Sequence, residues 1–238
     1  VHDIVIGYSE DGEPTNLRIG LGSQIDNISG THNTSIGTYS LYYNQSGSEN
    51  FAMGASSIQN NVSGSYLVGI GTNSLLDNVS GNYNLALGTS SMRGNIDGSG
   101  SISIGYLSLQ ENLHSNSNIA IGNNSMYQSQ GEDNVSIGVL SGRVAGISNV
   151  FIGNYAGSIT EGDYNVYIGN RAGYYAEGDN KLYIENSASS APLIYGDFAG
   201  DTVRINGSLQ VTNRTGTPNA IAGWRYMDSK ATEVQLGT

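Results

Sequence analysis

The stretch that decides the fold contains two copies of one short pattern. The first copy is Asn118-Ile119-Ala120-Ile121-Gly122-Asn123-Asn124-Ser125, and the second is Asn134-Val135-Ser136-Ile137-Gly138-Val139-Leu140-Ser141. In each copy two apolar residues flank a small residue, and a glycine follows. This alternation is typical of a short β-strand, because successive side chains of a strand point to opposite faces.

The glycine of this pattern recurs along most of the chain. It stands at Gly20, Gly37, Gly54, Gly71, Gly88, Gly105, Gly122, Gly138, Gly153 and Gly169. The spacing is 17 residues as far as Gly122, then 16, 15 and 16 residues to Gly169, and a further 16 residues lead to Glu185. A constant period of this kind predicts a repeat architecture in which each unit stacks on the next.

Each unit has the same order of residue types around its glycine. Apolar residues stand one and three positions before it, as Ile121 and Ile119 do before Gly122. We expect these two residues to point into the coil and the small residue between them to point away from it. Asparagine precedes most of the strands and is expected to form a turn, since it makes local hydrogen bonds to the backbone.

The units change near residue 138. Four residues after the glycine, the earlier units carry a large apolar residue and the later units carry glycine. The large residues are Leu41, Ile58, Leu75, Met92, Leu109 and Met126, and the glycines are Gly142, Gly157 and Gly173. We therefore expect the earlier coils to bury one more side chain each. In the later units an aromatic residue replaces the small strand residue, which predicts a stacked ladder of Phe151, Tyr167 and Tyr183 on the face opposite the coil interior.

These features predict an all-β protein, a parallel β-solenoid of about ten coils with repeats of 15 to 17 residues. Ten steps of about 4.8 Å give a stack of roughly 50 Å. We expect an irregular lead-in over residues 1–19, the array over residues 20–185 and a cap or junction over residues 186–238. Around Asn206-Gly207, alternating stretches predict a β-hairpin over residues 201–212 that caps the array. The prolines Pro14, Pro192 and Pro218 all lie outside the array.

Composition excludes several classes of function. Nine Lys and Arg against 20 Asp and Glu give a net charge of −11, which disfavours nucleic acid and anionic membranes as partners. No apolar run approaches the roughly 18 residues of a membrane-spanning helix, so we expect no membrane insertion. Cysteine is absent, so thiolate metal sites and disulfides are excluded. We expect no cofactor and no metal.

The two copies quoted above resemble the head repeats of trimeric autotransporter adhesins of the YadA type. The stretch from Asn149 to Gly157 and the stretch Pro192-Leu193-Ile194-Tyr195-Gly196-Asp197-Phe198 resemble segments of bacteriophage tail fibres and bacterial surface fibres. The resemblance covers residues 20 to about 211. It implies a left-handed parallel β-roll that forms a homotrimer. The 17-residue unit is longer than the usual coil of those adhesins.

The expected function follows from this resemblance. It is that of a structural fibre and adhesion protein, a trimeric segment of a tail fibre or surface adhesin located on a virion or at a bacterial cell surface. Its expected partners are its own copies, other fibre or virion components, and a host cell-surface glycan or protein. We do not expect an enzyme. A glycan-cleaving solenoid like a phage tailspike and a passive spacer are the alternatives.

The glycan-cleaving alternative depends on acidic residues at matching positions of consecutive units. These residues are Glu132, Asp133, Glu161, Asp163, Glu177 and Asp179. Stacked in register, they would form a ladder with carboxyl groups at the separations of about 5 to 10 Å that glycoside hydrolysis uses. The same ladder would suit Ca²⁺, although a solvated loop face is the simpler interpretation.

Tyrosine is the most suggestive candidate for a binding role, since 16 tyrosines accompany only three phenylalanines. An exposed tyrosine offers a flat apolar ring and a hydroxyl, which suit both sugar faces and protein epitopes. Several tyrosines fall on the loop side of their units, among them Tyr42, Tyr43, Tyr164, Tyr174 and Tyr175. Together with the predicted ladder, the candidate binding residues are Phe151, Tyr167, Tyr183, Tyr164, Tyr174 and Tyr175. Packing between coils is the competing interpretation.

Overall fold

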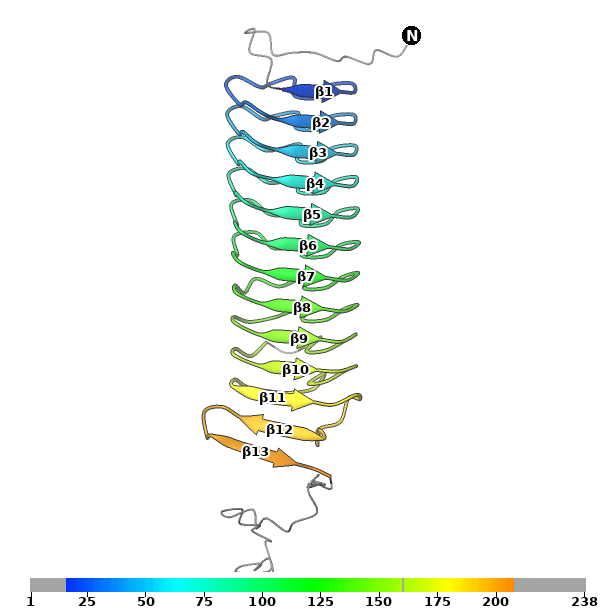
Figure 1. Cartoon of the computed structure of the whole chain (residues 1–238), viewed down its shortest axis with the longest axis vertical. Coiled ribbons are helices and arrows are strands. Elements are labelled where there is room, and N and C mark those ends of the chain that lie inside the picture. Colours follow the sequence, from blue (N-terminus) through cyan, green and yellow to red (C-terminus); the bar gives the residue numbers. More distant parts are fainter. Residues whose placement is uncertain (1–15, 160, 208–238) are drawn as a thin grey trace, which may run out of the picture. The chain divides into compact units, whose positions relative to one another are not determined.

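In the computed structural model, which describes residues 16–159 and 161–207, one strand per coil builds a single sheet along the stack (Figure 1). The strands are β1 (Leu17–Ile19), β2 (Thr34–Ile36), β3 (Phe51–Met53), β4 (Val68–Ile70), β5 (Leu85–Leu87), β6 (Ile102–Ile104), β7 (Ile119–Ile121), β8 (Val135–Ile137), β9 (Val150–Ile152), β10 (Val166–Ile168), β11 (Lys181–Ile184), β12 (Ile194–Asp197) and β13 (Thr202–Ile205). Their order in the sheet is their order in the sequence. The described part of the chain contains no helix, so the predicted all-β parallel solenoid of about ten coils is confirmed.

The register of the sheet follows the repeat. Strands β1 to β11 are parallel, and equivalent residues pair, as Ile104 does with Ile121 and Val135 with Val150. The turns pair in the same way, because Leu41 donates its amide to the carbonyl of Ser57 at 3.0 Å in the next coil. Backbone hydrogen bonds therefore join both the strands and the turns of neighbouring coils. Each position of a coil pairs with the equivalent position of the next coil, so the same residue types recur at the spacing of the repeat.

The repeated glycine directly follows each of the strands β1 to β10, at a corner of the coil, and we call it the corner glycine. Two features require glycine at this position. From Gly20 to Gly169 its φ lies between 119° and 142°, a region that residues with a side chain rarely adopt. At Gly105 a Cβ atom would lie 2.5 Å from the carbonyl oxygen of Gly122 in the next coil. A side chain at this corner would therefore collide with rigid backbone.

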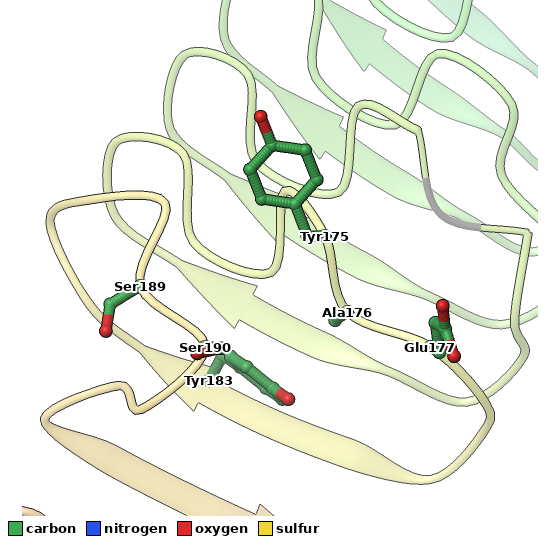
Figure 2. Close-up of a pocket in the computed structure, with 6 residues that line it drawn as sticks. All are labelled: Tyr175, Ala176, Glu177, Tyr183, Ser189 and Ser190. Carbon is green, nitrogen blue, oxygen red and sulfur yellow. The ribbon is translucent and has the colours of Figure 1, made fainter.

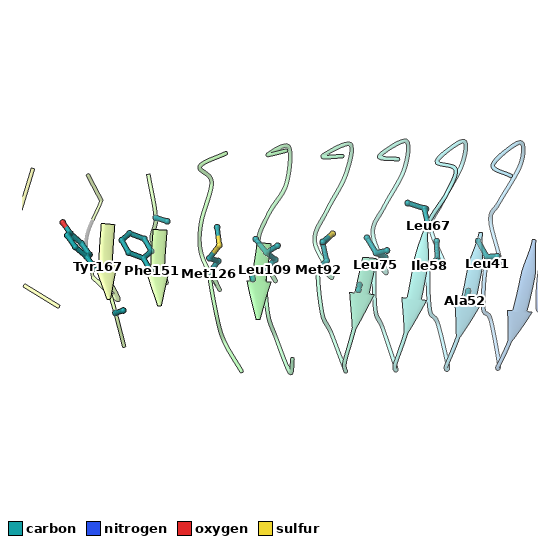
Figure 3. Close-up of a cluster of buried hydrophobic side chains, with 14 of the residues drawn as sticks. Leu41, Ala52, Ile58, Leu67, Leu75, Met92, Leu109, Met126, Phe151 and Tyr167 are labelled. Carbon is teal, nitrogen blue, oxygen red and sulfur yellow. The ribbon is translucent and has the colours of Figure 1, made fainter. Parts of the chain in front are cut away.

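The strand faces are the reverse of the sequence expectation. In β2 to β10 the residue between the two apolar positions is buried. The apolar residues themselves lie on the outer face, where Ile152 remains 40 % exposed. The interior of a 17-residue coil is narrow. It is filled by fully buried small strand residues such as Ala86 and Ala120. The large turn residues Leu75 and Leu109 are also fully buried, and Figure 3 shows them in one column. Larger strand residues consequently point outward.

The change of unit near residue 138 is an exchange of volume inside this narrow core. At Gly69 in the earlier coils, a Cβ would lie 2.7 Å from Cγ1 of Ile58, so the turn residue already occupies the space beside the strand. In the later coils the relation is inverted, since a Cβ at Gly157 would lie 2.6 Å from the ring of Phe151. Figure 3 shows the two rings of Phe151 and Tyr167 continuing the column of buried side chains. The later coils lack the large turn residue, as predicted, and the rings of the strand residues Phe151 and Tyr167 fill the volume that it would occupy.

Two columns of asparagine run through the coils. In one column the side chain of each asparagine donates to the side-chain oxygen of its equivalent in the preceding coil, as Asn78 does to Asn61 at 2.8 Å and Asn95 to Asn78 at 2.7 Å. In the other, Asn33 precedes β2, donates to the carbonyl of Gly47 and accepts the amide of Asn50. These asparagines are buried and connect neighbouring coils through hydrogen bonds. The predicted turn before the strand has its positive φ one residue earlier, at His32.

We expect the replacement Asn78→Leu to destabilise the stack. The change leaves the side-chain oxygen of Asn61 and the carbonyl of Gly81 without their donor. A buried polar group without its partner costs about 1–3 kcal/mol, so the free energy of unfolding should fall by at least that amount. Denaturant titration measures it. Ser80→Ala, at an exposed site of the same coil, is the control, and equal stabilities of the two variants would contradict the structural role of the column.

The parallel array ends at β11. Strand β12 pairs antiparallel with β11, and β13 pairs antiparallel with β12, so that Tyr183 lies opposite Tyr195 and Tyr195 opposite Arg204. Lys181 and Asp197 join β11 to β12 through an ion pair of 2.9 Å. Of the predicted hairpin over residues 201–212, the structure shows the first strand, β13, which pairs with β12. Residues 208–212 lie outside the described residues. Strand β1 precedes the predicted start of the array at Gly20.

Candidate functional site

The predicted ladder of Phe151, Tyr167 and Tyr183 exists, but it lies inside the coil. The ring centroids of Phe151 and Tyr167 are 5.3 Å apart, and those of Tyr167 and Tyr183 are 5.2 Å apart. Phe151 and Tyr167 have no exposed area, so the proposed role of these two residues in surface binding is wrong. The ladder packs the core, and the narrow interior described above is the reason.

Burial also sets the ionisation of the ladder. It raises the pKa of the Tyr167 hydroxyl well above its ordinary value, with the neighbouring Tyr183 and Asp179 adding to the effect. Burial raises the pKa of Tyr183 in the same direction. Both hydroxyls are neutral at physiological pH, as an ordinary tyrosine is, and the raised pKa values extend this neutral range to higher pH. Among the described residues, the hydroxyl of Tyr167 has no hydrogen-bond partner.

The other three candidate tyrosines reach the surface. Tyr164 is exposed at the turn before β10, in a different column from the other two. Tyr174 and Tyr175 follow β10 and contact each other edge to face, with ring centroids 4.7 Å apart and an interplanar angle of 79°. Tyr174 also contacts Tyr155 of the previous coil at 6.3 Å, and Arg171 lies over the Tyr155 ring at 5.5 Å. The contact with Tyr174 therefore restricts the orientation of the Tyr175 side chain, which is 67 % exposed.

A cavity of about 240 Å³ adjoins this tyrosine where the regular coils end. It is lined by Tyr175, Ala176, Glu177, Tyr183, Ser189 and Ser190. Figure 2 shows the ring of Tyr175 at one side of the cavity and Ser189 and Ser190 on the loop across from it. Tyr183 belongs to the core ladder, so the cavity opens onto the end of that ladder. Two of the candidate tyrosines, Tyr175 and Tyr183, are thus brought together at one site.

The residues that sequence analysis missed at this cavity come from an irregular loop. Ser189 and Ser190 follow Glu185, where the repeat has ended, and no period places them. Glu185 holds the loop, since its carboxylate accepts the amides of Asn186 and Leu193. These hydrogen bonds lower the pKa of Glu185 below its ordinary value, with the bond from Asn186 as the largest cause.

The predicted acidic ladder is partly formed, with a structural use. The carboxylate of Asp163 accepts the amide of Ile147 at 2.8 Å, and that of Asp179 accepts the amide of Asp163 at 2.8 Å. Serine and asparagine side chains do the same in the earlier coils, as Ser65 does for the amide of Ser48. Within residues 16–159 and 161–207, no group of three or more His, Cys, Asp and Glu is placed to hold a metal ion.

The outer face of the sheet is a continuous strip of apolar residues with Thr34 as an exception, which we name the outer strip. It consists of the residues one and three positions before each corner. These are Ile19, Ile36, Met53, Ile70, Leu87, Ile104, Ile121, Ile137, Ile152, Ile168 and Ile184 in one column and Leu17, Thr34, Phe51, Val68, Leu85, Ile102, Ile119, Val135, Val150, Val166 and Leu182 in the other. Every side chain in it is partly or largely exposed. Contiguous apolar surface of this length is characteristic of an interaction site.

A second apolar column lies on another segment of the coil, nine positions before the corner glycine. Its members Val62, Val79, Ile96 and Leu113 stack in consecutive coils through their backbones, and Val79 and Leu113 are each 38 % exposed. The chain therefore carries apolar surface on two separate segments of the same coils.

Comparisons with protein-family models, with curated proteins and with solved structures find no match to this chain. In the part of the chain that the structure describes, there is also no helix long and apolar enough to cross a bilayer. Function is therefore inferred from the residues themselves.

Proposed function

We propose that this chain is a segment of a homotrimeric fibre that displays a binding surface for a cell-surface glycan or protein, as part of a phage tail fibre or a bacterial surface adhesin. The observation that carries the proposal is the outer strip. A protein that keeps small and polar residues such as Ala86, Ser103 and Asn118 inside and isoleucine outside leaves its main apolar surface for a partner.

A second copy of the same chain is the partner that fits this surface. The outer strip extends over the whole parallel array, and another array of the same repeat matches its length and period. Closed rings of three require two different faces, one from each neighbouring copy. The outer strip and the column of Val62, Val79, Ile96 and Leu113 supply two such faces. The resemblance to trimeric adhesins and tail fibres supports the same stoichiometry.

Adhesion is supported by the features that remain outside these faces. The exposed tyrosines Tyr66 and Tyr83 stack at 4.8 Å with an interplanar angle of 5°, and Tyr174 and Tyr175 form the cluster described above. Rigid aromatic rings on a stiff scaffold lose little conformational entropy on binding. We propose that the protein acts by binding and carries out no catalysis.

We expect Ile104→Asp to dissociate the trimer. Its side chain lies on the outer strip, so the folded coil tolerates the change, whereas a charge buried between copies costs several kcal/mol. Light scattering should report three times 25.0 kDa for the unmodified chain and 25.0 kDa for the variant, with the β-sheet circular dichroism retained. Ser117→Asp is the matched control, because the equivalent position of the next coil already carries Asp133.

Two outcomes would reject this proposal. A monomeric unmodified chain at micromolar concentration would exclude the trimer, and an Ile104→Asp variant that keeps the trimeric mass would place the interface elsewhere. Binding of the labelled trimer to bacterial cells distinguishes an adhesin from a passive spacer, since a spacer gives no specific binding.

A further inference from the structure

We infer that the cavity lined by Tyr175, Glu177, Tyr183, Ser189 and Ser190 binds a single neutral sugar ring. The inference rests on the proposed adhesive function and assigns one location and one ligand class to it. The cavity lies where the repeat gives way to an irregular loop, so the repeat residues Tyr175 and Tyr183 are joined there by Ser189 and Ser190, which do not belong to the repeat.

The geometry of Tyr175 suits the apolar face of a sugar. Its ring is 67 % exposed, and the edge-to-face contact with Tyr174 fixes its orientation at one side of the cavity (Figure 2). Tyr174 is fixed in turn by Tyr155. A ring held in this way presents flat apolar area at low entropic cost, which is what the C–H face of a sugar requires.

The polar lining suits hydroxyl groups. The carboxylate of Glu177 accepts hydrogen bonds, and the hydroxyls of Ser189 and Ser190 can donate and accept. The Ser189 hydroxyl oxygen already accepts the amide of Ala191 at 3.0 Å, so its proton is directed elsewhere. The Tyr183 hydroxyl is protonated at neutral pH and can donate, and burial raises its pKa further. The lining therefore contains both donors and acceptors, which the hydroxyls of a sugar ring require.

Charge and size narrow the ligand class further. Glu177 is the only charged residue in the lining, and the chain carries a net charge of −11, so sialic acids, uronic acids and phosphates are repelled. The volume of about 240 Å³ is below the range of about 300–1,000 Å³ that drug-sized ligands occupy, so the cavity accommodates one ring and leaves the rest of a glycan outside. The ligand is a neutral hexose or N-acetylhexosamine at the end of a glycan.

Saturation-transfer NMR with the full chain tests this inference. The probes are glucose, galactose, mannose, N-acetylglucosamine and N-acetylgalactosamine, each at millimolar concentration, with sialic acid as the charged comparison. We expect at least one neutral sugar to bind and sialic acid not to bind. Tyr175→Ala should weaken that binding at least tenfold, and Glu177→Gln should weaken it severalfold.

The chain offers a matched control. Tyr43 occupies the same coil position as Tyr175, six residues after its corner glycine, and packs edge to face on Tyr42 with centroids 4.5 Å apart. It does not line this cavity. Tyr43→Ala should therefore leave sugar binding unchanged. An equal loss in both variants would show that sugar binding does not depend on this cavity and would overturn the inference.

The failure of this inference differs from the failure of the proposed function. If no neutral sugar binds, or if Tyr175→Ala binds as well as the unmodified chain, the cavity is not a sugar site. The trimer and its binding to cells would stand in that case, because they are measured separately by light scattering and by the labelled chain.

Discussion

Phe151→Ala should lower the free energy of unfolding by about 3–5 kcal/mol, and adding Gly157→Leu should restore most of that loss. Phe151 is fully buried, and its ring fills the space that turn residues such as Leu109 fill in the earlier coils. The backbone of Gly157 has a φ of 57°, close to the value of 48° at Leu109, so leucine fits the conformation. The double variant converts a later coil into an earlier one.

Gly157→Leu alone should be the most damaging of the three variants. With Phe151 in place, the new Cβ would lie 2.6 Å from its ring, and the leucine would have no space inside the coil. Denaturant titration of the two single variants and the double variant gives the coupling energy between the sites. Additive losses would contradict the exchange of volume, because independent sites add whereas sites that share one space compensate.

Gly105→Val should prevent the chain from folding. The corner at Gly105 has a φ of 137°, and a Cβ there would meet the carbonyl oxygen of Gly122 at 2.5 Å and its carbonyl carbon at 2.7 Å. The backbone strain alone is about 1–3 kcal/mol. The collision adds to it, since the carbonyl of Gly122 belongs to a coil held by hydrogen bonds on both sides. The yield of soluble protein and its circular dichroism measure the outcome.

Gly100→Ser is the control for that prediction. Gly100 has a φ of 70°, and the nearest atom to its Cβ would be the hydroxyl of Ser117 at 4.0 Å. The equivalent residues Tyr83 and Ser117 already adopt a φ of 58° and 57° with full side chains. The free energy of unfolding should change by no more than about 1 kcal/mol. Equal damage at Gly100 and Gly105 would mean that the stacked corner is not the cause.

The strands could be predicted residue by residue, but the alternation alone does not show which face of each strand is interior. An alternation such as Ile119-Ala120-Ile121 shows which side chains share a face but not which face is interior. The deciding signal was nevertheless present in the sequence. Each large apolar residue four positions after the glycine accompanies a small residue two positions before it, whereas Phe151 accompanies Gly157. Two positions that exchange volume in this way occupy the same space, and that space is the core.

The cavity was only partly predictable for a related reason. Tyr175 and Tyr183 lie in the repeat, so their rows are known from the spacing, and Glu177 falls in the predicted acidic ladder. Ser189 and Ser190 belong to the loop between β11 and β12, whose path depends on the hydrogen bonds of Glu185 and not on any period. The spacing of the repeat predicts only the positions of residues inside the repeat, and these two serines of the cavity lie beyond its end.

The uniform register from β2 to β7 has a consequence for the length of the protein. Each of these coils forms the same backbone hydrogen bonds with the next coil at a spacing of 17 residues. The backbone of any one of them can therefore stack on that of any other. Deletion or duplication of a 17-residue segment therefore joins two surfaces that already match, and the break point within the segment is immaterial. Recombination within such a gene can lengthen or shorten the protein in steps of about 4.8 Å without creating a new junction.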